Sequence, residues 1–294
     1  MTDHWKDVAW NGICFKAPPT WEIGRIGPRH LILEEEAGPV LEVKWGLVKG
    51  NFSHRSHLKR ICASQSGKIK GRIAEWFLPP HWLKALADYD ASGFRWQGEN
   101  AAGRGAILYC SGCRNATLIQ FLGESSPERE KVLLAVLKSF RDHRSDGTAH
   151  WQVFDLRLKL PAFLKLLRYR FETGKYQLLF SDGRQRIRFY RWAPAAAILA
   201  GRDLAWFCET IPDFGAGGRP ETTTIDGCDA VEGHVAPPDG WRRTISRLKA
   251  TPSFFWYRLW HLKDKNRLLA VQAESKRGLD FELLTQICTD YESL

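Results

Sequence analysis

The sequence consists of two similar halves, and this internal duplication places the strongest limit on the possible folds. Residues 10–18 (WNGICFKAP) are echoed at 151–161 (WQVFDLRLKLP). Each copy leads into an apolar strand and then a tryptophan-bearing one, at 30–45 and at 176–192. Because these blocks follow in the same order, the sequence predicts one domain of ordinary size present in tandem.

The later parts of the two halves also correspond. Residues 67–82 resemble 224–241, and each half ends in an apolar hairpin followed by a helix. The predicted domains are therefore 1–145 and 148–294. The polar linker between the copies, DHRSDGTAH at 142–150, is short, which predicts that the domains pack as a pseudo-symmetric pair.

The pattern within a copy is strand, strand, strand, helix, strand, hairpin, helix. In the first copy, 31–35 and 40–48 form a predicted hairpin, Ser53 can cap the helix that follows, and Pro127 opens the last helix. Consecutive hairpins with helices inserted late favour an antiparallel sheet covered by helices over a parallel βαβ arrangement. The predicted fold class is α+β, an α/β/α sandwich in each copy.

The second copy repeats this plan with local changes. Its predicted strands lie at 156–160, 177–180 and 186–192, and 195–207 is predicted as one helix. The density of Gly and Pro in 211–224 predicts a mobile loop, which is either a cover for a site or an inert insertion.

The opening motif FKAPPTW (15–21), an apolar strand ended by Pro and followed by Trp, introduces a family resemblance. With the strands and helices that follow, the chain resembles the PsbP-like fold of photosystem extrinsic proteins, the Ran-binding Mog protein and several small bacterial proteins. The second copy reads LKLPAFL, without Trp at the matching place. The resemblance implies partner binding rather than catalysis, and it implies no catalytic residues.

Composition limits the class of protein. The 294 residues are 44% hydrophobic and 26% charged, as in folded globular proteins, and no apolar stretch approaches the roughly 18 residues of a membrane span. The amino terminus lacks a secretory apolar run, so a cytoplasmic location without membrane insertion is expected. The net charge of +10 is shared between the halves, which weakens a nucleic-acid interpretation without removing it.

The thirteen tryptophans are unusually many for this length, and several recur at matching places. The simplest interpretation is that such pairs fill equivalent core sites in the two copies. The pairs are Trp10 with Trp151, Trp45 with Trp192, and Trp82 with Trp241.

Cys110-Ser-Gly-Cys113 is the sharpest local signal for chemistry. Two thiols at this spacing can share a metal or exchange a disulfide, and Ser-Gly permits the tight turn that either requires. A structural zinc site needs four ligands, and the nearest further candidates are His81 and His143, which lack the paired spacing of a zinc finger. A plain turn with two thiols remains the alternative.

Other motifs favour ordinary surface or loop roles. His54 and His57 share one face of the predicted helix, where a solvated basic face is favoured over a metal site. The run FGAGGRP (214–220) lacks the strand and helix that a dinucleotide-binding loop requires. No nucleophile elbow or HExxH motif occurs, so no catalytic residue and no cofactor is predicted.

The basic and aromatic run from 157 to 192 is the best argument for a charged partner. Its strand RQRIRFYRW alternates arginines with apolar residues, which predicts a row of guanidinium groups on the solvent side. Such a row can bind anions, acidic proteins or single-stranded nucleic acid, or be a solvated face. The candidate residues are Arg184, Arg186, Arg188, Arg191, Tyr190 and Trp192.

The leading hypothesis is a non-enzymatic binding or protein-interaction protein, whose partner is another protein or an acidic ligand. The duplicated features build a fold, and no catalytic spacing is duplicated. The alternatives are an enzyme or a thiol redox or metal protein with a site between the domains, and a nucleic-acid-binding protein that uses the basic strand of the second copy. Oligomeric state is not predicted.

Overall fold

A computed structural model describes residues 5–65, 72–99, 101–124, 126–237 and 253–294. The chain divides into two compact units. Unit 1 comprises 1–146 and 150–154, and unit 2 comprises 147–149 and 155–294. Each unit is described by itself.

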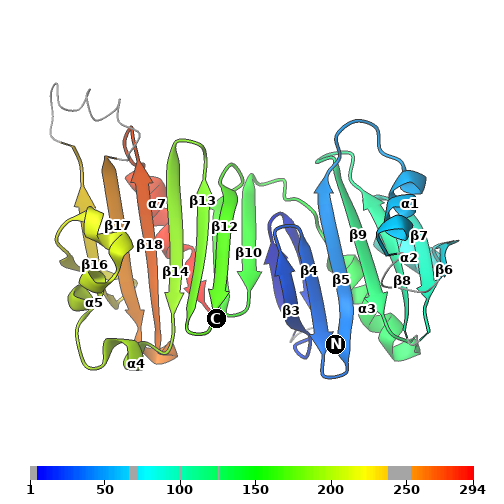
Figure 1. The fold of residues 1–294 in the computed structure, drawn as a ribbon, viewed down its shortest axis with the longest axis horizontal. Coiled ribbons are helices and arrows are strands. Elements are labelled where there is room, and N and C mark those ends of the chain that lie inside the picture. Colours follow the sequence, from blue (N-terminus) through cyan, green and yellow to red (C-terminus); the bar gives the residue numbers. More distant parts are fainter. Residues whose placement is uncertain (1–4, 66–71, 100, 125, 238–252) are drawn as a thin grey trace. The chain divides into compact units, whose positions relative to one another are not determined.

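Unit 1 is built on a seven-stranded antiparallel sheet with the strand order β3-β4-β5-β9-β8-β7-β6 (Figure 1). Its strands are β1 (Lys6–Trp10), β2 (Ile13–Ala17), β3 (Glu22–Gly27), β4 (His30–Glu35), β5 (Gly38–Leu47), β6 (Arg72–Trp76), β7 (Asp90–Gln97), β8 (Ala102–Tyr109) and β9 (Asn115–Leu122). Its helices are α1 (His54–Gln65), α2 (Pro80–Ala85) and α3 (Pro127–Ser139). Strand β10 (Thr148–Val153) pairs with β1 through its residue Gln152.

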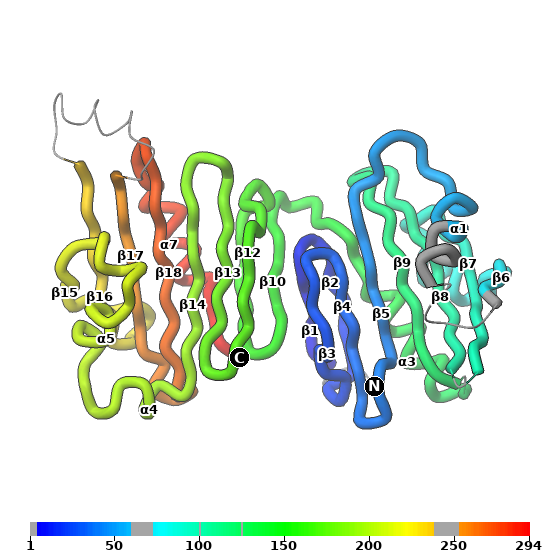
Figure 2. The backbone as a smooth tube through the Cα atoms, viewed as in Figure 1, coloured from blue at the N-terminus to red at the C-terminus, as the bar shows by residue number. Residues whose placement is uncertain are grey.

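Unit 2 follows the same plan, with the strand order β12-β13-β14-β18-β17-β16-β15 (Figure 2). Its strands are β11 (Leu156–Pro161), β12 (Lys165–Glu172), β13 (Lys175–Ser181), β14 (Gln185–Trp192), β15 (Glu221–Ile225), β16 (Cys228–Val235), β17 (Phe254–Leu262), β18 (Arg267–Ser275) and β19 (Tyr291–Ser293). Its helices are α4 (Ala195–Leu199), α5 (Leu204–Thr210) and α7 (Phe281–Thr289), with 3-10 turns η1 (Pro212–Gly217) and η2 (Lys263–Lys265).

Helices cover both faces of the unit 1 sheet, so this unit is an α/β/α sandwich (Figure 1). Alternate residues of a strand point to opposite faces. Arg104 of β8 forms an ion pair with Glu130 of α3, which places α3 on that face. Ile107, on the other face of β8, lies in an apolar cluster with Leu58 of α1. The α+β fold class is therefore as predicted.

Unit 2 has the same layers. Trp192 of β14 contacts Phe207 of α5, with ring centroids 5.3 Å apart. Phe189, on the opposite face of β14, contacts Tyr291 just after α7, also at 5.3 Å. Accordingly, α5 lies in front of the sheet and α7 behind it in Figure 1.

Several local expectations for unit 2 are wrong. The helix predicted at 195–207 is two helices, because Ala200 and Gly201 adopt left-handed conformations with φ of +49° and +81°. The segment predicted as a mobile loop contains η1 and β15. Phe214 of η1 is buried, and Gly217 lies so close to Tyr257 that a Cβ would approach its ring to 2.4 Å.

The predicted echoes of tryptophan and of the later strands are also partly wrong. Trp45 and Trp192 are both buried, but Trp45 lies on the face that α3 covers and Trp192 on the face that α5 covers. Residues 67–82 contain β6, whereas 224–241 contain β16, and the shared strand order matches β16 with β7. Trp241 lies outside the described residues.

The strands that the sequence did not predict are β1, β3, β7, β10, β12, β15 and β19. Much of β12 is exposed on both faces, and a bulge between Leu166 and Arg168 interrupts its alternation.

Within the described part of the chain, no helix has the length and hydropathy that crossing a membrane would require.

Candidate metal centre

The hairpin between β8 and β9 holds both cysteines of the CxxC motif. Its turn is closed by hydrogen bonds from the Arg114 N–H to the Cys110 carbonyl, at 2.8 Å, and from the Cys110 N–H to the Asn115 carbonyl, at 3.0 Å. Arg114 is left-handed, with φ of +59°, which reverses the chain. The turn therefore holds the two thiols on one short, closed segment.

The second segment of the site follows α3. Arg141 forms an isolated antiparallel bridge with Cys14 of β2, with both backbone hydrogen bonds at 2.8 Å. This bridge holds the backbone immediately before Asp142 and His143. Asp142 is 3% exposed, although it lies in what the sequence predicts as a polar linker.

Four side chains from these two segments converge. One ligand atom from each of Cys110, Cys113, Asp142 and His143 lies within 4.8 Å of all the others. The Cys113 thiol donates to Asp142 Oδ2 at 3.0 Å, and His143 Nδ1 lies 2.8 Å from Asp142 Oδ1. Cys110 Sγ is 3.7 Å from His143 Nδ1. The structure thus brings His143 to the CxxC motif and adds a buried carboxylate.

One separation in the cluster matches that expected across a tetrahedral cation. Zinc bonds of about 2.3 Å to sulfur and about 2.0 Å to nitrogen, at the tetrahedral angle, separate S and N by roughly 3.5 Å. The observed separation between Cys110 Sγ and His143 Nδ1 is 3.7 Å. The Cys113 to Asp142 distance is shorter, because a proton lies between these two atoms and holds them together.

The electrostatics of Cys113 are set by its surroundings. Burial, together with the hydrogen bond to Asp142, raises the pKa of the Cys113 thiol to about 12. The thiol therefore keeps its proton at neutral pH and donates a hydrogen bond to the carboxylate. A thiol in this state is a poor nucleophile, but a metal ion can displace the proton.

A pocket of about 310 Å³ adjoins the cluster and is bordered by Cys110, Asp142 and His143. Tyr89 also lines it, and its hydroxyl lies 3.5 Å from Asp142 Oδ1 and 3.4 Å from the Phe140 carbonyl. Burial and the nearby Asp142 charge raise the pKa of Tyr89 above its usual range. Tyr89 therefore stays neutral beside the carboxylate.

The other predicted histidines lie elsewhere. His81 Nε2 lies 3.0 Å from Glu130 of α3, and His54 Nε2 lies 3.0 Å from Asp90 Oδ1. His57 packs on Phe52, with ring centroids 4.9 Å apart. The group of metal-ligating side chains found among the described residues contains none of these three histidines.

The predicted arginine row is only partly a solvent-facing surface. Arg186 and Arg188 share one face of β14, and both pair with Glu274, at 3.5 and 3.4 Å. Arg188 also donates to Gln272 at 2.7 Å. Arg184 precedes the strand, in the turn before β14. The single carboxylate of Glu274 therefore offsets only part of the charge of the row.

The remaining members of that candidate set are buried. Arg191 lies on the opposite face from Arg188, since three positions separate them, and it pairs with Asp155. Tyr190 and Trp192 are 0% and 6% exposed and stack at 5.0 Å. The expectation that Arg191 lies on the solvent side is wrong, and the two aromatic rings belong to the core.

Comparison with known proteins gives distant similarities only. The Ran-binding protein Mog1p of Saccharomyces cerevisiae is similar at 8% identity and a TM-score of 0.32, over 47% of this chain and 95% of that one. A structure from Bacteroides thetaiotaomicron VPI-5482 has 13% identity and a TM-score of 0.29, over 53% of each chain. MucB in complex with MucA(peri) has 8% identity and a TM-score of 0.21, over 96% of this chain and 82% of that one.

No family model and no curated protein matches the chain. The similarity to Mog1p concerns the fold alone.

Proposed function

We propose that the chain is a binding protein whose unit 1 holds one divalent transition-metal ion of the zinc type. The ligands are Cys110, Cys113, Asp142 and His143. The observation that carries this proposal is the convergence of their four ligand atoms within 4.8 Å, from two segments that are far apart in sequence.

The donor set supports a borderline-soft cation. Two thiolates and an imidazole suit zinc, copper or iron, whereas magnesium and calcium prefer oxygen ligands alone. Four protein ligands would fill a tetrahedral shell and leave no open position for a substrate. A metal bound in this way would tie the β8–β9 hairpin to the segment after α3, and its role would be binding and stabilisation rather than catalysis.

A thiol redox role is the second candidate, because Cys110 and Cys113 have redox-motif spacing. Its weakness is the pKa of Cys113, which burial and Asp142 raise to about 12. Redox-active cysteines have lowered values and attack as thiolates. The environment of Cys113 therefore favours metal binding.

The test is metal analysis of full-length protein purified without chelator and then equilibrated with Zn²⁺. We expect one zinc per chain, and none in Cys113→Ser or Asp142→Asn. At free zinc about 100-fold above Kd, binding adds about 2.7 kcal/mol to the free energy of unfolding. That gain corresponds to a rise in Tm of roughly 5–10 °C for a unit of this size.

The matched control is Cys228→Ser, which removes a half-buried thiol of unit 2 and should keep the zinc. A wild-type protein that binds no stoichiometric metal and shows no zinc-dependent Tm contradicts the proposal. If Cys110 and Cys113 instead form a disulfide reversibly under mild oxidants, the redox candidate replaces it.

A further inference from the structure

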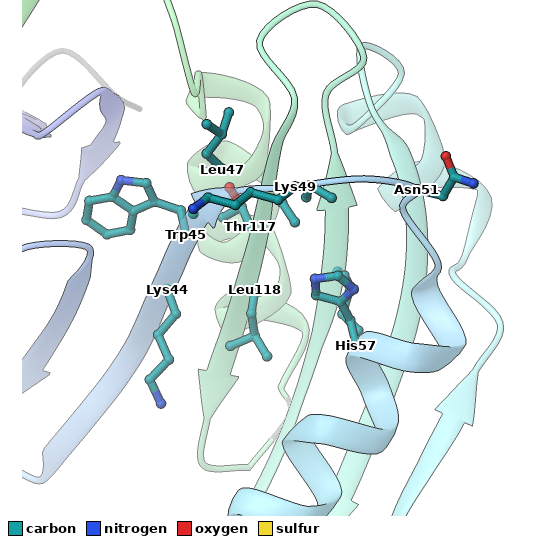
Figure 3. A pocket seen from close by; sticks show the side chains of 12 residues that line it. Lys44, Trp45, Leu47, Lys49, Asn51, His57, Thr117 and Leu118 are labelled. Atoms are coloured by element: carbon teal, nitrogen blue, oxygen red, sulfur yellow. The ribbon is translucent and has the colours of Figure 1, made fainter.

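The largest of the described pockets in unit 1 lies between α1 and the sheet and shares no lining residue with the pocket beside the cysteine cluster (Figure 3). It has a volume of about 610 Å³, within the range of small-molecule sites. Ile107 and Leu118 line it from β8 and β9, and Gly46 from β5. His57 projects from α1 above these strands. The pocket therefore has an apolar base and a polar rim.

The titratable side chains that line this pocket are all basic: Lys44, Lys49 and His57. Lys44 pairs with Glu42 at 2.6 Å, so part of its charge is offset. Within the described part of the chain, Lys49 has no ion-pair partner. His57 Nδ1 lies 3.1 Å from the Ser53 carbonyl oxygen, which holds the ring over the pocket. The rim is suited to an anion.

Unit 2 shows what fills the same space when the chain supplies it. In each sheet the central hairpin ends in a left-handed residue, Arg114 in unit 1 and Asn266 in unit 2. In unit 1, Gly46 pairs with Ala116, two positions after Arg114. In unit 2, Trp192 pairs with Leu268, two positions after Asn266. These two positions are therefore structurally equivalent.

The same register matches Lys44 with Tyr190. In unit 2, Tyr190 and Trp192 stack at 5.0 Å with an interplanar angle of 4°. The Tyr190 hydroxyl donates to the carboxylate of Asp213 at 2.5 Å. Stacked rings with an anion at their edge thus occupy the space that lysine and glycine leave open in unit 1.

We infer that this pocket of unit 1 binds a small aromatic anion, such as an aryl carboxylate. The ring would lie on Ile107 and Leu118, in the space that Trp192 fills in unit 2. The carboxylate would contact Lys49 at the rim. This site is separate from the metal centre, and neither proposal depends on the other.

The probe is 2-naphthoate, measured by isothermal titration with full-length protein, and the neutral comparison is 2-naphthylmethanol. We expect saturable binding of naphthoate, and binding of the alcohol about tenfold weaker, because an ionised group strengthens each hydrogen bond. Lys49→Met should weaken naphthoate binding by about tenfold. The exposed Lys138→Met of α3 is the matched control and should leave the affinity unchanged.

Gly46→Trp tests the location. A Cβ at Gly46 meets only Arg29 Nη1, at 3.8 Å, so a side chain can leave the backbone here without a clash at its first carbon. This variant should abolish naphthoate binding while it retains zinc. Equal affinity for the alcohol and the acid overturns the anion assignment. Unchanged affinity in both Lys49→Met and Gly46→Trp, or no binding to wild type at millimolar probe, overturns the site.

Discussion

The hairpin between β8 and β9 in unit 1 and that between β17 and β18 in unit 2 hold the same position in the same strand order, yet different groups close them. In unit 1, Cys113 precedes the left-handed Arg114 and donates a hydrogen bond to Asp142. In unit 2, Lys265 precedes the left-handed Asn266, and its ammonium group donates to the Ser293 carbonyl.

The facing segments correspond as well. Arg141 lies opposite Cys14, and Glu292 lies opposite Arg157, just before Asp142 and Ser293 respectively. Unit 2 thus brings its own cation to this corner as Lys265. Among the described residues of unit 1, four possible metal ligands face this corner in place of a lysine, and the proposed metal ion would take the position of that cation.

The sheet faces under α1 and α5 differ as well, since unit 2 fills with aromatic side chains the space that is a pocket in unit 1. Trp192→Ala, which empties part of that space, should give the largest loss of stability. Trp192 is 6% exposed and packs on Tyr190 and Phe207. Truncating a buried Trp costs about 3–5 kcal/mol. Denaturant unfolding monitored by circular dichroism measures this loss. A cost below about 1 kcal/mol would mean that the rings do not fill this space.

The control for that prediction is Trp206→Ala. Trp206 lies on the same helix as Phe207 but is only partly buried, and Arg202 packs on its ring at 4.9 Å. Its truncation should cost clearly less than that of Trp192. If both variants lose the same stability, the contrast between a filled unit 2 face and an open unit 1 face is not supported.

The sequence alone pointed to one half of the candidate metal site. Cys110 and Cys113 share a turn, so their proximity follows from local spacing alone. Asp142 and His143 reach them through the bridge between Arg141 and Cys14, which joins residues 127 positions apart. Such long-range pairing leaves no periodic pattern in the sequence, so Asp142 was predicted to lie in a polar linker. Only its position just after the end of a helix could have indicated a role.

The fold followed the same division between local and distant information. The hairpin of β4 and β5 and the start of α3 at Pro127 were predictable from turn and cap residues; Ser126 Oγ accepts from the Arg129 N–H at 3.1 Å. The burial of Tyr190 and Trp192 was not predictable, because arginines and aromatic residues both occur along β14. Strand parity shows which residues share a face, but tertiary packing decides which face is buried.

The zinc affinity proposed for the unit 1 corner should depend on pH. Since burial and Asp142 raise the pKa of Cys113 to about 12, zinc must expel this proton, and the expulsion alone raises zinc affinity about tenfold per pH unit between pH 6 and 8. Cys113→His, whose ordinary pKa is near 6.5, should lower the slope by about one between pH 7 and 8. Competition titration with a chromophoric chelator measures it, and equal slopes contradict the proton on Cys113.

The metal-free protein gives the matching stability profile. A pKa raised from the ordinary 9.0 to about 12 contributes stability that is complete below pH 9 and is lost as pH rises through 12. Cys113→Ser should flatten this alkaline loss.

The smallest effect tests the corner of unit 2. Lys265→Met removes the hydrogen bond from the lysine ammonium group to the Ser293 carbonyl, and Ser293 is 1% exposed. The free energy of unfolding should fall by about 1 kcal/mol, because the carbonyl loses a charged donor while the lysine stem is largely in water. Lys263→Met is the control, since its ion pair with Asp229 joins two side chains that are 66% and 65% exposed and should not change unfolding measurably. Added zinc should leave both differences unaltered, because these lysines belong to the corner that carries its own cation. A zinc-dependent rescue of Lys265→Met would mean that the two corners are not independent.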